Sequence, residues 1–260
     1  GLFIILSCNS NSHNLKQPLE DSTNQETARH REIPQIKYSP TKIIEFEPPN
    51  DYSRLETTKY GRWIRNIRLT KDNIVYYFDG TKKSNQDIHV AVLDLDVGKR
   101  DLQQCADACM RIRTEYLFEQ GDYSSIKFLF ANGKWSKSFE NYTTKRTHTA
   151  FRSYMNYIYS FANTASLKKQ MTSIPEIKDI EVGDVFVQSG NPYGHAVTVM
   201  DVCKDKRGNK MFMLSQSYMP AQSIEVLINP ANNTAWYPAK FEGDLITPEW
   251  VFTKNDLKRF

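Results

Sequence analysis

Short runs of apolar and β-branched residues, each closed by turn residues, recur along the chain from residue 74 and predict β-strands. Residues 195–202 and 210–217 flank a turn sequence at 205–209, so we expect them to pair as an antiparallel hairpin. Residues 126–135 predict another hairpin, around Asn132 and Gly133. The expected strands cover residues 74–78, 88–97, 183–187, 195–202, 210–217, 224–228 and 250–252.

Two segments instead repeat their apolar positions every three or four residues, as one face of an α-helix does. The first begins at Asp101, a residue type favoured at helix N-caps, and ends near residue 120, where Gly121 provides a stop signal. The second carries a stripe that we interpret as core packing, made of Phe151, Tyr154, Ile158 and Phe161. A helix followed by an antiparallel sheet predicts the α+β class.

The first 55 residues have a different character from the rest. Residues 1–8 are apolar and end in Ser7-Cys8, which resembles the end of a bacterial lipoprotein signal, with Cys8 as the lipidated residue. The alternative for this run is a short buried strand. Residues 9–55 are polar, contain five prolines and predict a tether, so residues 56–260 are expected to form a single domain. This interpretation places the protein in the bacterial cell envelope, on its periplasmic or outer surface, with the membrane as a partner through the lipid.

Composition and charge restrict the class of protein further. The chain has 260 residues, 40% of them hydrophobic, and a formal charge of +4, which fits a folded protein with a sizeable core. Residues 122–170 contain eight Lys or Arg residues and two acidic residues. Such a stretch is either a solvated face or a surface for an anionic polymer. No nucleic-acid-binding motif accompanies it, so nucleic acid is not an expected partner.

The four cysteines, Cys8, Cys105, Cys109 and Cys203, are too few and too scattered for a disulfide framework. With Cys8 assigned to lipid, three remain, so at least one thiol is free. Cys105 and Cys109 lie four positions apart on one helical face, which strains a disulfide between them and indicates a core position for Cys109. The chain has neither a CxxC pair nor an HExxH segment, so we expect neither a metal nor a cofactor.

Cys105 and His195 are the candidate catalytic pair. Cys105 lies near the start of the first expected helix, and His195 begins a strand directly after Gly194. The partial positive charge at a helix start lowers a thiol pKa, and a neighbouring imidazole can take the proton and return it. The alternative interpretation is that Cys105 only packs in the core and that His195 is a hydrogen-bonded histidine of the core.

Three further polar residues are candidates for the same site. Gln216, on the strand after His195, would hold the imidazole, although strand register decides whether Gln216 points inward. Gln104 could donate a hydrogen bond to an oxyanion, a role that the backbone N–H of Cys105 also fits. His89 is the alternative base, because it lies on a strand that ends just before the Cys105 helix.

The strand segments 182–186 and 194–199 resemble the Gly-Asp strand and the His strand of the NlpC-type cell-wall peptidases. That resemblance implies a papain-like α+β fold, with Cys first, His second and a polar third residue on the next strand, where this chain has Gln216. The nucleophile segment of that group, Asp-Cys-Ser or a close variant, differs from Gln-Cys-Ala around Cys105.

Longer phrases resemble a narrower group, a family of bacterial lipoproteins catalogued as a domain of unknown function. The resemblance extends from about residue 60 to the end and supplies no activity. It rests on residues 101–108, 194–196, 216–222, 247–250 and 259–260.

These features lead to two main hypotheses for the function. The first is an envelope cysteine hydrolase, a peptidase or amidase that cleaves amide bonds of a peptide or peptidoglycan-like substrate with Cys105, His195 and Gln216. The alternative is a surface-binding lipoprotein of papain-like fold that holds glycan or protein without catalysis. A transglutaminase-like acyl transfer shares the order of Cys and His, but usually has Asp as its third residue.

Overall fold

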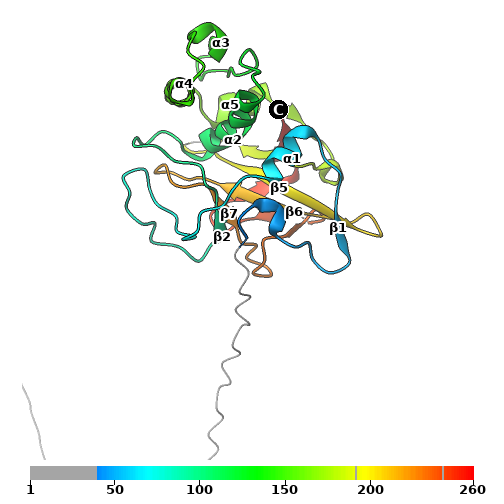
Figure 1. Cartoon of the computed structure of the whole chain (residues 1–260). Helices are drawn as coiled ribbons and strands as arrows, with labels where there is room; N and C mark the ends of the chain where they lie inside the picture. The colour runs from blue at the N-terminus through cyan, green and yellow to red at the C-terminus, as the bar shows by residue number, and fades with distance from the viewer. Residues whose placement is uncertain (1–39, 191, 242) are drawn as a thin grey trace, which may run out of the picture. The chain divides into compact units, whose positions relative to one another are not determined.

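The computed structural model describes residues 40–190, 192–241 and 243–260 (Figure 1). The predicted lipidation residue Cys8 and the signal remnant 1–8 lie outside the described residues, as does most of the predicted tether. These described residues form one compact unit.

A large antiparallel sheet lies at the centre of the described part of the chain. Nine of the eleven strands in this part form the sheet, with the central order β2-β7-β6-β5-β4-β11-β3, while β1 pairs with β5 and β8 pairs with β6. The remaining two strands, β9 and β10, pair with each other. The strands are β1 (Tyr52–Arg54), β2 (His89–Val92), β3 (Thr172–Ser173), β4 (Val185–Gln188), β5 (His195–Asp205), β6 (Lys210–Gln216), β7 (Glu225–Leu227), β8 (Tyr237–Pro238), β9 (Asp244–Ile246), β10 (Val251–Thr253) and β11 (Leu257–Arg259).

The α-helices gather on one side of this sheet. Figure 1 shows α1, α2 and α5 over the sheet, with α3 and α4 beyond them. The combination of helices with a mainly antiparallel sheet confirms the predicted α+β class. The helices are α1 (Lys59–Arg65), α2 (Cys105–Glu119), α3 (Phe139–Tyr142), α4 (His148–Phe161) and α5 (Thr164–Gln170), with 3-10 turns η1 (Ile43–Glu45), η2 (Ile177–Asp179) and η3 (Lys254–Asp256).

Residues 40–55 are part of the folded domain, so the expected boundary at residue 56 is too late. Ile43 of η1 is fully buried, and β1 pairs with the far end of β5. Arg54 Nε also lies 2.7 Å from Asp201 Oδ2. The polar composition of residues 40–55 does not indicate that they belong to the folded domain, because the partner of Arg54, Asp201, lies 147 positions later in the chain.

Helix α2 begins at Cys105 with Gln104 as its N-cap, three residues after the predicted N-cap Asp101, and it ends as predicted before Gly121, whose φ is 71°. The Asp101 carboxylate accepts a hydrogen bond from the backbone N–H of Ala221 at 2.7 Å instead of capping the helix. The side chain of Asp107 accepts from the backbone N–H of Gln104 at 3.1 Å. A contact across the fold therefore moves the helix start, and it makes Cys105 the first helical residue.

The strand predictions are correct around the centre of the sheet and wrong towards the N-terminus. Strands β4, β5, β6, β7 and β10 fall within or next to the predicted segments. Residues 74–78 form only isolated bridges, from Tyr76 to Lys82 and from Tyr77 to Gln222, and residues 88–97 keep only β2. The predicted hairpin around Gly133 is present in a short form, with one antiparallel bridge between Leu129 and Trp135. Backbone hydrogen bonds from Phe130 to Lys134 and from Ser136 to Phe128 flank this bridge.

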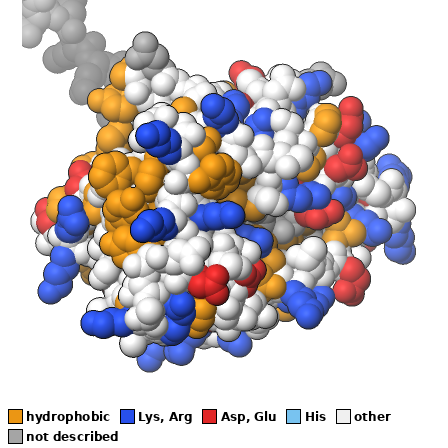
Figure 2. Space-filling view, turned by 90° about the horizontal axis from the view of Figure 1, so that it is seen from above, with side chains coloured by type: hydrophobic (Ala, Val, Ile, Leu, Met, Phe, Trp, Pro, Cys, Tyr) orange, Lys and Arg blue, Asp and Glu red, His pale blue; other side chains and the backbone are white. Residues whose placement is uncertain are grey.

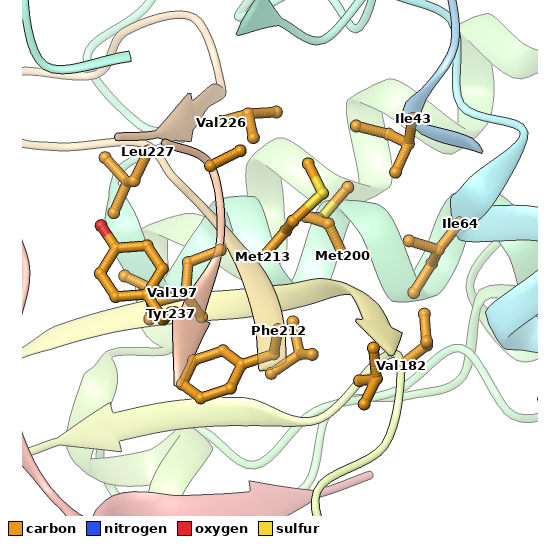
Figure 3. Close-up of a cluster of buried hydrophobic side chains, with 14 of the residues drawn as sticks. Ile43, Ile64, Val182, Val197, Met200, Phe212, Met213, Val226, Leu227 and Tyr237 are labelled. Carbon is orange, nitrogen blue, oxygen red and sulfur yellow. The ribbon is translucent and has the colours of Figure 1, made fainter. Parts of the chain in front are cut away.

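Two clusters of buried hydrophobic side chains form the core. The first surrounds the central strands and includes Val197 of β5 and Phe212 of β6 (Figure 3). The second joins α2, α4 and α5 to the sheet and includes Cys109 and Ala196. Ala196 and Val197 belong to different clusters because successive side chains of a strand point to opposite faces.

The predicted stripe of α4 is buried except at its end. Phe151, Tyr154 and Ile158 are fully buried, whereas Phe161 is 52% exposed. Trp135 is also exposed, and so are the nearby Lys127, Lys134 and Lys137. Figure 2 shows hydrophobic side chains gathered among Lys and Arg on the face seen from above.

Candidate active site

Cys105 presents its thiol at the N-terminus of α2, against the start of β5. The thiol donates a hydrogen bond to the carbonyl oxygen of Gly194 at 3.8 Å. Burial raises the pKa of the Cys105 thiol to about 11, with a further contribution from Asp107, against the backbone N–H groups of Ala106 and Ala196 and the Thr164 hydroxyl, which lower it. Desolvation thus outweighs the favourable helix start, and the thiol is neutral at neutral pH.

Glycine is required at position 194 because the backbone there passes close to the end of β4 and the start of α5. A Cβ atom there would lie 2.3 Å from the carbonyl oxygen of Gln188 and 3.1 Å from Cγ2 of Thr164. The first contact joins β5 to β4, and the second joins it to the start of α5. The Gly-His segment of the sequence therefore has a packing reason as well as a chemical one.

His195 is the first residue of β5, and its imidazole is buried among aromatic rings. The ring centroids of Tyr218, Trp250 and Phe252 lie at 5.0, 5.2 and 5.8 Å. Nε2 lies 2.9 Å from Oε1 of Gln216, which is itself 1% exposed. Burial lowers the pKa of His195 to about 4, although the Gln216 hydrogen bond opposes this effect. The imidazole is therefore neutral at neutral pH.

The structure brings His195 and Gln216 together and places the Cys105 thiol beside the backbone of His195. Within the described residues no hydrogen bond joins the thiol to the imidazole. Ala196, the next residue of β5, packs in the cluster that includes Cys109 of α2, whereas the His195 ring stacks on Phe252. The thiol and the imidazole thus have different hydrogen-bond partners in this structure.

Gln104 and Cys109, the next two predicted residues, both have partners at or close to Cys105 in the sequence. Gln104 Nε2 donates a hydrogen bond to Asp101 Oδ1 at 3.0 Å. The amide that was predicted to donate to an oxyanion is therefore engaged by Asp101. Cys109 is 2% exposed, and its thiol donates to the Cys105 carbonyl oxygen at 3.6 Å. Its burial agrees with the predicted core position.

His89 does not contact the thiol. Its Nε2 lies 3.0 Å from the Asn73 carbonyl oxygen, and its Nδ1 lies 3.3 Å from Glu225 Oε2. Both ring nitrogens therefore face oxygen acceptors on the β2–β7 side of the sheet. The alternative base is instead a neighbour of the polar network that supports Gln216.

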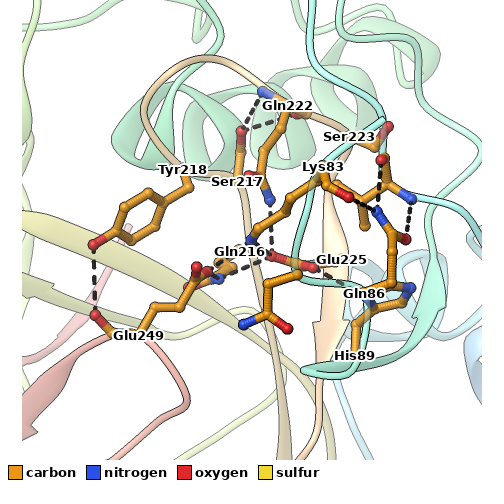
Figure 4. Close-up of polar contacts among 12 residues, drawn as sticks. Lys83, Gln86, His89, Gln216, Ser217, Tyr218, Gln222, Ser223, Glu225 and Glu249 are labelled. Carbon is orange, nitrogen blue, oxygen red and sulfur yellow. Dashed lines mark hydrogen bonds and ion pairs between the residues drawn. The ribbon is translucent and has the colours of Figure 1, made fainter. Parts of the chain in front are cut away.

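That network contains three residues that the sequence reasoning missed (Figure 4). Glu225 and Glu249 both accept from Gln216 Nε2, at 3.0 and 2.7 Å. Lys83 Nζ lies 2.9 Å from Glu225 Oε1 and 2.8 Å from Glu249 Oε2. Lys83 and Glu249 are 166 positions apart, so no local spacing could indicate their contact.

Comparisons with known proteins supply a family and no activity. In the described part of the chain, no helix is long and apolar enough to cross a membrane, and no group of three or more His, Cys, Asp or Glu side chains is placed to hold a metal ion. No curated protein and no solved structure matches the chain. One family matches residues 44–149 and 132–259. The chain therefore belongs to the family described as Domain of unknown function (4846).

Proposed function

We propose that this protein is a cysteine hydrolase that cleaves amide bonds in a peptide or peptidoglycan-like substrate. In this proposal Cys105 is the nucleophile, His195 the base and then the acid, and Gln216 the residue that orients the imidazole. The observation that carries it is the 2.9 Å contact between His195 Nε2 and Gln216 Oε1, beside a thiol at a helix start. An amide oxygen only accepts hydrogen bonds, so Nε2 carries the hydrogen and Nδ1 keeps a lone pair for a thiol proton.

The proposed reaction begins from a neutral thiol and a neutral imidazole. Substrate binding brings Sγ and Nδ1 within hydrogen-bonding distance, the thiol proton moves to Nδ1, and Sγ bonds to the amide carbon. The backbone N–H groups at the start of α2 stabilise the resulting oxyanion. The C–N bond breaks, the amine leaves with the proton from Nδ1, and a thioester remains. Water then gives a proton to Nδ1 while its oxygen bonds to the thioester carbon. The C–S bond breaks, the sulfur takes the proton back from Nδ1, and the thiol and a carboxylic acid result.

The papain-like fold, the envelope location and the lipid anchor on Cys8 are further parts of this proposal. The order of α2 before the antiparallel strands β4, β5 and β6 supports the papain-like arrangement. The anchor and the location rest on the sequence of residues 1–8. A peptidoglycan-like substrate follows from the location and from the resemblance to the NlpC-type strands.

A second candidate function, binding without catalysis, is favoured by the shape of the surface. Four depressions with volumes of 310–480 Å³ lie in the described part of the chain, and none of these four is lined by Cys105 or His195. The raised pKa of the Cys105 thiol also suits a packing role. In that case the protein would hold glycan or peptide and leave it intact.

Turnover of defined muropeptides separates the two functions. The full chain carrying Cys8→Ser is incubated with amide-containing muropeptides, and products are identified by mass spectrometry. We expect cleavage by this parent and a loss of about 100-fold or more in Cys105→Ala and His195→Ala on the same background. Circular dichroism must show that the variants remain folded. Undiminished cleavage by Cys105→Ala would exclude the nucleophile, and tight binding without cleavage by the parent would favour the second function.

A further inference from the structure

The orientation of the Gln216 amide is fixed by two carboxylates. Its nitrogen donates to Glu225 Oε1 at 3.0 Å and to Glu249 Oε2 at 2.7 Å, so both of its hydrogens are used (Figure 4). Reversing the amide would place its oxygen against both carboxylates and its hydrogens against His195 Nε2. Two charge-assisted hydrogen bonds would then be replaced by repulsion between oxygens.

Lys83 keeps this pair of carboxylates together. It is 4% exposed, and its ammonium group contacts both Glu225 and Glu249. Without this cation the two neighbouring carboxylates would repel each other, and one of them would take up a proton. A protonated carboxyl group can donate a hydrogen bond, so it would also accommodate the reversed amide of Gln216.

A further donor and an imidazole nitrogen lie beside Glu225. Gln222 Nε2 donates to its Oε1 at 2.8 Å, and His89 Nδ1 lies 3.3 Å from its Oε2. Burial acts to raise the pKa of the Glu225 carboxyl, but His89, Lys83 and Gln216 together hold it below its usual value. Glu225 is therefore ionised at neutral pH and acts only as an acceptor.

We propose that Lys83, Glu225 and Glu249 are positioning residues that set the tautomer of His195 through Gln216. They hold Oε1 of Gln216 towards Nε2 of His195, so the ring hydrogen resides on Nε2 and Nδ1 remains unprotonated. The catalytic meaning of this tautomer rests on the proposed function, whereas the tautomer itself is a property of the folded protein. The role of the three residues is indirect, because they act on the imidazole only through the amide of Gln216.

Nitrogen NMR of the histidine rings in the full chain tests this inference without any substrate. Long-range proton–nitrogen correlation spectra at pH 7 distinguish a protonated from an unprotonated ring nitrogen, and loss of signals in His195→Gln assigns the His195 ring. We expect a single Nε2–H tautomer in the parent. We expect a mixture of both tautomers in the double variant Glu225→Gln/Glu249→Gln, because a glutamine amide can either donate to or accept from Gln216.

Two companion variants make the result decisive. Glu249→Gln alone alters a side chain that is 21% exposed and remains informative if the fully buried Glu225 cannot be replaced without unfolding. Glu140→Gln, at an exposed position in α3, is the matched control and should leave the spectrum unchanged. A single Nε2–H tautomer in folded Glu249→Gln and in the folded double variant would overturn the inference. A tautomer shift without turnover by any protein, parent included, would retain it and reject the hydrolase.

If the hydrolase is active, kinetics provide a second measurement. A shift of the His195 tautomer removes the base from the chemical step, so kcat should fall by about 10-fold or more in Glu249→Gln while KM changes little. Unchanged kcat in a variant with a mixed tautomer would show that the network has no catalytic role.

Discussion

The side-chain oxygen of Gln216 in β6 lies 2.9 Å from Nε2 of His195 in β5, with both residues almost completely buried. Antiparallel pairing of the two strands brings these residues, 21 positions apart, into contact. A hydrogen bond between a neutral amide and a neutral imidazole costs less desolvation than an ion pair would at the same depth. The contact is therefore compatible with a histidine whose pKa is lowered to about 4.

Thiol reactivity should follow both exposure and pKa. On the Cys8→Ser background we expect iodoacetamide to alkylate Cys105 first, because Cys109 and Cys203 are 2% and 0% exposed. The rate should keep rising with pH towards about 11, since only the thiolate reacts and the pKa of Cys105 is raised to that value. Peptide mass mapping of the folded protein measures the order. Faster modification of Cys203, or a rate that levels off below pH 9, would contradict this account.

Acidification should destabilise the protein through His195. The unfolded histidine takes up a proton near pH 6.5, whereas the folded one stays neutral until about pH 4. Between these values the unfolded state binds more protons, so the free energy of unfolding decreases as pH falls, by up to roughly 3 kcal/mol from this group. Urea unfolding from pH 7 to pH 4 measures the decrease. His195→Gln should show a shallower dependence, and an identical slope in both proteins would refute the assignment.

Removing the Lys83 charge should be costly. Lys83→Met leaves the fully buried Glu225 and the partly exposed Glu249 near each other without their cation, and we expect a loss of about 3 kcal/mol in the free energy of unfolding. Adding Glu225→Gln to this variant removes one of the uncompensated charges and should recover part of the loss. Denaturant unfolding of the two single variants and the double variant gives the coupling energy. Strict additivity of the two single effects would argue against the network.

Gly194 should resist even the smallest substitution. Gly194→Ala places a methyl group 2.3 Å from the Gln188 carbonyl oxygen, so β4 and β5 must separate locally. We expect a loss of about 1–3 kcal/mol, typical of overpacking. The Cys105 thiol should also become more reactive, because its contact with the Gly194 carbonyl is disturbed. A melting temperature equal to that of the parent would show that the segment tolerates the methyl group.

The local sequence pattern was sufficient for the helices and strands around the candidate site. Apolar spacing indicates α2 and α4, and turn residues at 205–209 indicate the β5–β6 hairpin. It was insufficient for the start of α2, because Asp101 uses its carboxylate for the backbone of Ala221. It also failed for β1, whose partner strand lies far along the chain.

The sequence by itself determined the α+β class, the family and the identity of the thiol, imidazole and amide that lie near one another. These follow from periodicities and phrases within short segments. Only the tertiary structure decided that the thiol contacts the backbone carbonyl of Gly194 while the imidazole of His195 stacks on Phe252. Only the tertiary structure placed Lys83, Glu225 and Glu249 around Gln216, because three distant segments meet there through strand pairing and burial. Their charges cost too much to bury singly, so the packed fold brings them together as a group.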